Sequence, residues 1–76
     1  MQDNFRFLNT IKILHVEVLW QMLYNIRQNL ETLEKQCFDA ERAGDYKNFY
    51  KCLKSLNQCR WKVLEVSKEI ENRVLK

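Results

Sequence analysis

The chain has 76 residues, enough for one small domain but too few to bury a large hydrophobic core. With 46% hydrophobic and 30% charged residues it is too apolar to be intrinsically disordered. Its net charge of +3, spread over 13 basic and 10 acidic residues, is too weak to indicate nucleic-acid binding by itself. A domain of this size usually relies on disulfides, a metal, very regular helix packing or a partner subunit for stability.

The cysteines and the N-terminal residues predict a reduced, cytosolic protein without a membrane span. Three cysteines are an odd number, and the first residues, MQDNFRF, include an acid and no long apolar run of the kind found in secretory signals. The longest uncharged stretch rich in apolar residues, 18–26, has nine residues, whereas a transmembrane helix needs about 20.

The first half of the chain predicts one long helix, from about residue 10 to residue 43. Residues 1–9 form either a loose arm or the start of this helix, whose candidate N-caps are Asn9, Thr10 or, for an earlier start, Asp3. Its apolar residues recur at alternating gaps of three and four, the spacing of a coiled-coil seam. The seam residues are Val16, Leu19, Leu23, Ile26, Leu30, Leu33, Cys37 and Ala40.

The second half predicts another helix, about 46–75, after a turn at 44–45. Its seam has the same spacing and consists of Phe49, Cys52, Leu56, Cys59, Val63, Val66 and Ile70. If the chain folds back at the turn, residues whose numbers add up to 89 face each other, as Leu19 and Ile70 would, and each such pair joins the two seams. We therefore predict an all-α fold, an antiparallel two-helix hairpin with a coiled-coil-like seam, completed by a partner or by self-association.

The turn residues agree with this hairpin. Gly44 is the only glycine, and the chain contains no proline. Glycine can adopt the left-handed conformation that ends a helix, Asp45 can cap the start of the next one, and Arg42 places a cation in the last turn of the first.

More apolar residues are present than one seam can use. On the second helix a further apolar face lies roughly 120° from the seam, at Tyr46, Tyr50, Leu53, Trp61, Leu64 and Leu75. On the first helix the residues outside the seam are Ile11, Ile13, Leu14, Val18, Trp20, Met22 and Tyr24. Three coverings are possible for this surface: the N-terminal segment with Phe5, Phe7 and Leu8, a second copy of the chain, or a different protein.

Residues that could support catalysis or bind a metal are few. The single histidine, His15, is about 33 Å of helix away from Cys37, and the chain has no C-x-x-C pair. Cys37 and Cys52 fall at one level across the hairpin, so they either form a disulfide or remain buried thiols. We expect no metal, no cofactor and no enzymatic activity.

The residues therefore predict a non-enzymatic protein-interaction module. The expected partner-binding residues are Trp20, Tyr24, Tyr46, Tyr50, Leu53, Trp61, Leu64 and Leu75. The alternative is a homodimeric four-helix bundle that binds RNA or DNA through a lysine stripe on the second helix, formed by Lys47, Lys51, Lys54 and Lys62. Acidic residues, Glu65 and Glu69, dilute this stripe, so nucleic acid is the less favoured ligand.

The segment ERAGDYKNFYKCLKSLNQCRWKVLEVSKEIENRVLK, about half of the chain, resembles the second half of the small E-type co-chaperones of type III secretion needle subunits. The shared features are a hairpin of similar length, a Gly44–Asp45 turn followed by an aromatic residue (Phe49 or Tyr50), and a final helix rich in Val, Leu and Ile. The resemblance implies a bacterial cytosolic protein that pairs with a helical-repeat chaperone and keeps a needle subunit monomeric. It implies that Trp61 and Leu64, with Trp20 and Tyr24, contact that chaperone.

Overall fold

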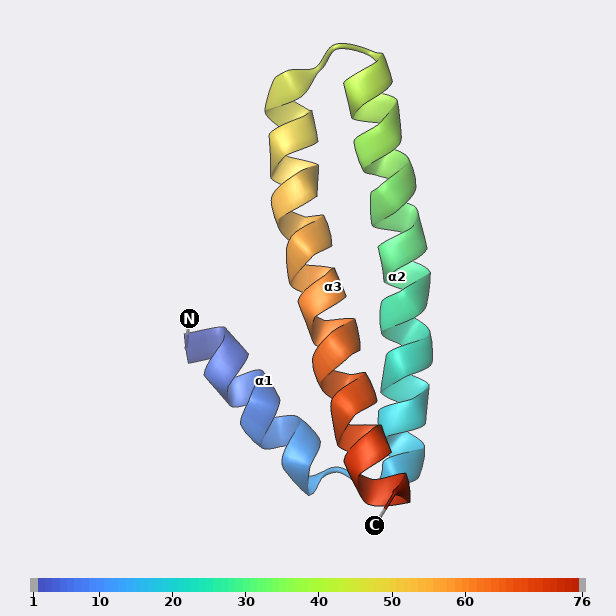
Figure 1. Cartoon of the computed structure of the whole chain (residues 1–76). Coiled ribbons are helices and arrows are strands. Elements are labelled where there is room, and N and C mark those ends of the chain that lie inside the picture. The colour runs from blue at the N-terminus through green and yellow to red at the C-terminus, as the bar shows by residue number, and fades with distance from the viewer. Residues whose placement is uncertain (1, 76) are drawn as a thin grey trace.

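The computed structural model, which describes residues 2–75 and the side chains of residues 4–75, consists of three helices. They are α1 (Gln2–Ile13), α2 (Val16–Arg42) and α3 (Tyr46–Val74). Helices α2 and α3 form the long antiparallel hairpin, and α1 lies beside the C-terminal half of α3 (Figure 1). The prediction of an antiparallel hairpin is confirmed, whereas the prediction of only two helices is wrong, because the N-terminal residues form a helix of their own.

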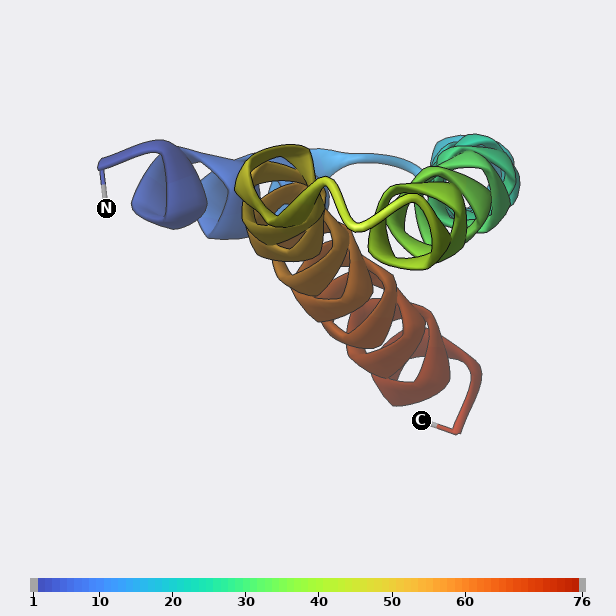
Figure 2. The same ribbon diagram turned by 90° about the horizontal axis from the view of Figure 1, so that it is seen from above.

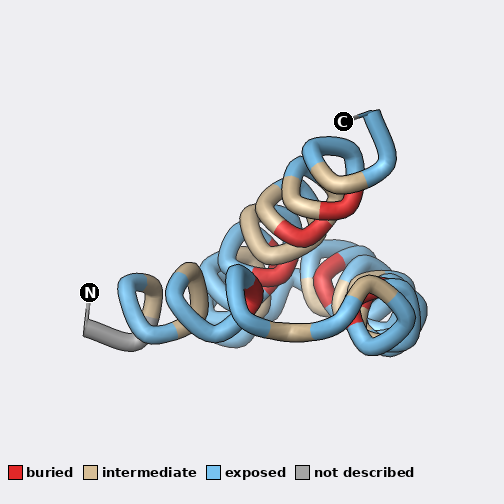
Figure 3. Tube along the Cα trace, turned by 90° about the horizontal axis from the view of Figure 1, so that it is seen from below, coloured by how far each residue is buried: buried red, intermediate tan, exposed pale blue. Residues whose placement is uncertain are grey.

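The predicted seam is the packing interface of the hairpin. Every predicted seam residue of α2 and α3 is buried or half-buried. The best-buried group lies at the end of the hairpin nearest α1, where Leu19, Leu23, Val66 and Ile70 form one cluster. In Figure 3 the buried segments, in red, lie where the helices face one another. The periodicity of the sequence thus identified which side of each helix turns inward.

The turn between α2 and α3 has the backbone chemistry that the sequence predicted. Gly44 has a φ of 73°, in the left-handed region. Its amide donates to the carbonyl of Glu41 at 3.1 Å, and the amide of Asp45 donates to the carbonyl of Ala40 at 2.9 Å. These two bonds form a Schellman motif, which satisfies carbonyls at the end of α2 that have no partner within the helix.

Asp45 caps the start of α3, also as predicted. Its Oδ1 accepts a hydrogen bond of 3.4 Å from the backbone amide of Asn48, and its Oδ2 accepts one of 2.6 Å from the Asn48 side chain. The cap therefore satisfies one of the free amides in the first turn of α3.

The long helix predicted for residues 10–43 is interrupted at Leu14 and His15, which is a correction to that prediction. His15 has an extended backbone (φ −65°, ψ 150°) and is the N-cap of α2, where its Nδ1 accepts a 3.4 Å hydrogen bond from the amide of Glu17. Asn9 and Thr10 are not N-caps: both lie inside α1, and the Thr10 hydroxyl donates to the carbonyl of Arg6. Asp3 also lies within α1 rather than before it.

The break allows α1 to fold back along α3 and bury its own apolar side. Ile11 is only 2% exposed and joins the cluster formed by α2 and α3, while Phe7, Leu8 and Leu14 pack against its edge. Near the start of α1, the Asn4 side chain accepts a hydrogen bond from Gln58. The two helices run in the same direction, because Asn4 meets Gln58 and Leu14 meets Arg73. The N-terminal segment is therefore a docked helix, not a loose arm.

Arg73 fixes the end of α1. Its guanidinium donates to three carbonyl oxygens in the last turn and just beyond, those of Ile11 and Lys12 at 2.9 Å each and that of Leu14. Glu69, one turn earlier on α3, holds the same guanidinium in an ion pair of 3.2 Å. A cation at a helix C-terminus opposes the negative end of the helix dipole, and here it also satisfies unpaired carbonyls.

The three helices form an elongated body. Its radius of gyration is 14.5 Å, whereas a compact domain of this length would have about 11 Å. The solvent-accessible surface is 6090 Å², about 1,100 Å² more than the roughly 5,000 Å² expected for a compact monomer of 9.3 kDa. None of the described helices is both long enough and apolar enough to span a membrane.

We predict that Gly44→Ala lowers the free energy of unfolding by about 1 kcal/mol. A Cβ at this position meets no atom within 4 Å, so the cost comes from the left-handed backbone and not from a steric clash. Urea denaturation followed by circular dichroism measures the change. Gly44→Asn should cost less, since asparagine tolerates this conformation better than alanine, and an alanine variant as stable as the wild type would contradict the prediction.

We predict that Arg73→Gln frees α1 while the hairpin stays folded. Hydrogen bonds from a charged donor each contribute roughly 1.5 kcal/mol or more, so the hydrogen-exchange protection of α1 amides should fall by at least about tenfold. Amides in the middle of α2 and α3 should keep their protection. Arg73→Lys retains the charge but not the forked geometry, and should recover only part of the effect. Unchanged protection of α1 in Arg73→Gln would show that the clamp does not hold the helix.

Candidate interaction surface

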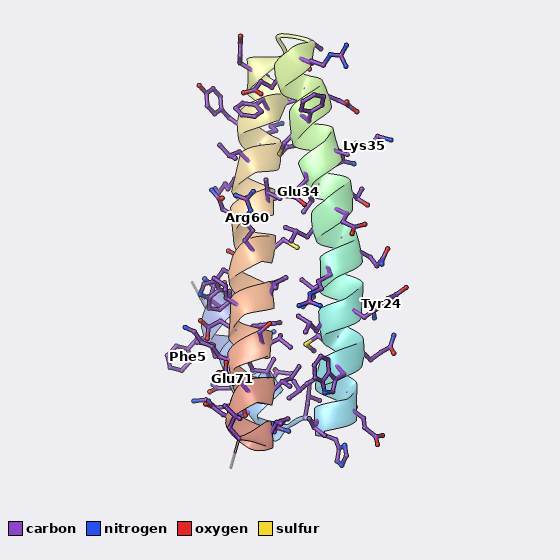
Figure 4. All side chains as sticks on the ribbon, turned by 45° about the vertical axis from the view of Figure 1, so that its right-hand side comes forward. Phe5, Tyr24, Glu34, Lys35, Arg60 and Glu71 are labelled. Carbon is purple, nitrogen blue, oxygen red and sulfur yellow. The ribbon has the colours of Figure 1, made fainter. Side chains whose placement is uncertain are left out.

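The hairpin has two broad sides, and α1 covers only one of them. Figure 2, a view along the hairpin, shows α1 on the left beside α3 and α2 on the right. Figure 4 looks onto the other side, where Glu34 and Arg60 point toward the viewer and α1 lies behind α3. These two residues are joined by a 3.9 Å ion pair between α2 and α3.

The uncovered side of the hairpin carries a row of large apolar residues from each helix. In two antiparallel helices, the residues that directly follow the seam positions lie on the same side of the pair. We call this surface the open face; its large apolar residues are Trp20, Tyr24 and Phe38 of α2, Tyr46, Tyr50, Leu53, Leu64 and Val74 of α3, and Leu75, the C-cap of α3. All of these are exposed except Leu53, which is half-buried.

The structure brings together most of the residues predicted to bind a partner. Seven of the eight lie on the open face: Trp20, Tyr24, Tyr46, Tyr50, Leu53, Leu64 and Leu75. Trp20 is 53% exposed and Tyr24 is 60% exposed, so the described residues leave more than half of each accessible to a partner. Phe38 and Val74 belong to the same face but were absent from the predicted set. Phe38 directly follows the seam residue Cys37, and this spacing was the signal that could have found it. Val74 lies past the last seam residue, Ile70, and only the structure places it in the groove beside Trp20.

Trp61 is the exception, because α1 lies over it. The ring centroids of Phe7 and Trp61 are 5.8 Å apart, and Trp61 is half-buried. Trp20 is therefore exposed, whereas Trp61 is covered by the N-terminal segment, one of the three coverings considered for the surplus apolar surface. The reason is the unpredicted helix α1, which turns Phe7 toward α3.

At the end of the open face nearest the N-terminus of α2, the two helices enclose an apolar groove of about 450 Å³. Leu23 and Ile70, two core residues, line its floor, and Trp20 and Val74 are among its walls. A partner side chain entering this groove would meet the hydrophobic core directly. Grooves of this kind, apolar and open along their length, accept the apolar side of an amphipathic helix.

The middle of the open face is charged. Glu34 and Arg60 form the ion pair described above, with both side chains about half exposed, so that pair contributes little to stability. Arg27 and Glu31 are exposed nearby on α2. Among the described side chains, Arg27 and Glu31 form no ion pair within 4.0 Å. The open face therefore has a polar centre and large apolar residues toward both ends, with Glu71 also lining the groove at one end.

The lysine stripe is shorter in the structure than in the sequence. Lys62 lies over the Phe7 ring, with Nζ 5.5 Å from the ring centroid, so α1 occupies that end of the stripe. Lys47, Lys51 and Lys54 remain exposed on α3. Three exposed lysines on one helix make a solvated surface rather than an extended path for a nucleic-acid backbone.

The cysteines are free thiols, and Cys37 and Cys59 are buried in the seam. Burial raises the pKa of both thiols above the ordinary value of 9.0, and Cys52, the neighbour of Cys37 across the seam, adds to the shift of that residue. The Cys59 Sγ donates a 3.5 Å hydrogen bond to the carbonyl of Ile26. In the described part of the chain, no three histidine, cysteine or acidic side chains converge as a metal site would require.

Comparisons of this chain with protein-family models, curated proteins and solved structures found no match.

We predict that stability declines at alkaline pH because of the seam thiols. A thiol whose pKa is higher in the folded state keeps its proton longer there, so its stabilising effect is complete below about pH 9 and is lost as pH rises through the folded pKa. Urea midpoints at pH 8 and pH 10.5 should therefore differ more in the wild type than in a Cys37→Ala, Cys59→Ala variant. An equal decline in both proteins would show that the thiols do not contribute.

Proposed function

We propose that this protein is a non-enzymatic interaction module that binds an amphipathic helical segment of a partner protein across its open face. The observation that carries the proposal is the exposure of Trp20, which lines a groove whose floor is the hydrophobic core, and of Tyr24 one turn further along the same helix. Aromatic residues of this kind supply much of the binding energy in protein interfaces.

The free energy of binding would come mainly from covering apolar surface. Each Å² of apolar surface removed from water contributes about 25 cal/mol before the costs of association are counted. The chain exposes about 1,100 Å² more than a compact monomer of its mass, which exceeds the roughly 800 Å² that each partner buries in a standard interface. A partner could therefore cover the open face without any change in the hairpin.

The shape of the face favours a helix as its ligand. Two parallel ridges of side chains, one from α2 and one from α3, flank the extended line where these helices meet. An added helix, or a pair of helices, would turn the hairpin into a three- or four-helix bundle and bury the aromatic rings in a shared core. The polar centre, with Glu34 and Arg60, would fix the position of the ligand along this line.

The resemblance to E-type co-chaperones suggests a specific form of this function. In that form the protein works in the bacterial cytosol, its open face binds a helical-repeat chaperone, and the pair keeps a needle subunit monomeric. The Gly44–Asp45 turn and the α2–α3 hairpin support the resemblance. Trp61 could contribute to such an interface only if α1 moved away from it, so Trp20, Tyr24 and Leu64 are the better candidates.

We predict that Trp20→Ser weakens partner binding by at least about tenfold, because an exposed tryptophan that becomes buried in an interface typically contributes about 2 kcal/mol or more. The candidate partners are the proteins encoded by neighbouring genes, co-expressed with this chain and co-purified with it. In a Trp61→Phe background, Trp20 is the only tryptophan, and its fluorescence should shift to shorter wavelength when the partner covers it.

The matched control is Gln36→Ser, which changes an exposed residue of the same helix that directly precedes a seam position and so lies on the side away from the open face. Circular dichroism should show the same helicity in both variants. If Trp20→Ser and Tyr24→Ser bind the partner as tightly as the wild type does, the open face is not the binding surface.

A further inference from the structure

We infer that a second copy of this chain occupies the open face when no other protein does, and that the two copies pair antiparallel, each with its open face against the other. This inference rests on the proposed function in that it uses the same surface. It adds the identity of one partner and the register in which that partner binds. The resulting dimer is a four-helix bundle made of two stacked hairpins, with both α1 helices on the outside.

The distribution of residue types along the open face fits a two-fold axis through its centre. One end carries Trp20 and Tyr24, the other end carries Phe38, Tyr46 and Tyr50, and most of the charged residues lie between them, with Glu71 and Glu41 at the ends. A two-fold rotation perpendicular to the helices places each end of one copy over the opposite end of the other, and each centre over the other centre. The centre is complementary to itself, as the interface of a symmetric dimer must be, and Trp20 and Tyr46 lie beside Glu41 and Glu71 of the second copy.

The charges of α2 set the register of the antiparallel pair. If residues whose numbers add up to about 61 lie opposite each other, Arg27 of one copy meets Glu34 of the other, and the same contact occurs twice. Tyr24 then lies at the level of Phe38, so aromatic rings meet as well. Glu31 lies near the axis close to its own counterpart, with an Arg27 side chain one turn away on each copy to offset the repulsion.

Helix α3 agrees with the same axis. Because α2 and α3 are in register when their residue numbers add up to 89, an axis near residue 31 of α2 passes near residue 58 of α3. Leu53 of one copy then faces Leu64 of the other, and Asn57 faces Arg60. Both contacts join compatible side chains, an apolar pair and a hydrogen-bonding pair.

A parallel arrangement of the two copies does not bring Arg27 and Glu34 together. It would place α2 of one copy against α3 of the other, and the counterpart of Arg27 would lie between Arg60 and Leu64. Arg60 would then be equally close to Arg27 and to Glu31, so attraction and repulsion would offset each other. The antiparallel arrangement instead places Arg27 opposite an acidic residue of the second copy.

The amount of surface and the position of α1 also permit the pairing. The surplus of about 1,100 Å² per chain exceeds the roughly 800 Å² that each subunit of a standard-sized interface buries. Helix α1 docks on the opposite side of the hairpin, behind α3 in Figure 4, so it does not obstruct a second copy.

The test measures the mass of the purified full-length chain in solution by sedimentation equilibrium, from about 1 to 200 µM, with the charge variants alongside. We expect a dimer of twice 9.3 kDa. Arg27→Glu and Glu34→Arg should each weaken it by at least tenfold, because each places like charges together at two contacts. The double variant, Arg27→Glu with Glu34→Arg, should restore the dissociation constant within about threefold when all variants carry Arg60→Gln, which removes the like charge that Arg60 would present to position 34. Restoration of this kind requires Arg27 and Glu34 to meet across the interface.

Two controls separate this contact from other effects of charge. Gln36→Glu changes a residue outside the open face and should leave the dimer intact. Arg60→Gln removes the Glu34–Arg60 pair within each chain without placing like charges together, and should weaken the dimer much less than Glu34→Arg. All these residues are exposed, so helicity should be unchanged in every variant.

A chain that stays monomeric at 200 µM, or a dimer that neither single charge variant weakens, overturns the inference. The inference is also overturned if the dimer of the double variant is no tighter than the dimers of the single variants. The proposed function is tested separately. A monomer that still binds a co-expressed protein through Trp20 refutes the homodimer alone. A chain that neither dimerises nor binds a co-expressed protein refutes both the homodimer and the proposed function.

Discussion

Two packed helices can bury the apolar residues along only one side of each helix, and the rest of this structure depends on that limit. The seam of α2 and α3 satisfies one stripe per helix, yet the chain carries enough apolar residues for more. On one side of the hairpin, α1 covers additional apolar residues, adds Ile11 to the core and places Phe7 over Trp61. On the other side, the additional apolar residues form the open face. Its size follows from having three helices where four would close the bundle.

The sequence predicted the features that depend on local spacing. Alternating gaps of three and four determine which side of a helix turns inward, and one glycine followed by an aspartate marks the turn, so the hairpin and its caps were predictable. The break at Leu14 was not, because no glycine or proline lies there and the free carbonyls are satisfied by Arg73, which is 59 residues away in the chain. The position of Trp61 followed from the same unseen break. The open face was predictable except for Phe38, Val74 and the loss of Trp61.

The two proposed uses of the open face exclude each other in any one molecule. A second copy and a different protein would cover the same rings, Trp20 and Tyr24 among them, so each lowers the apparent affinity of the other. Self-pairing would keep the aromatic surface out of water until a stronger ligand arrives. The polar centre matters for this choice, because charged residues between two groups of large apolar residues favour one register and discourage indiscriminate association.

The clamp formed by Arg73 and Glu69 has a consequence for how the molecule loosens. It joins the last turn of α3 to the last turn of α1, so the beginning and the end of the chain should open and close as one cooperative unit. The Gly44 end, which has its own caps, lies far from this junction and would move independently of it. Fluctuations at the two tips of the rod are therefore uncoupled, although one continuous seam connects them.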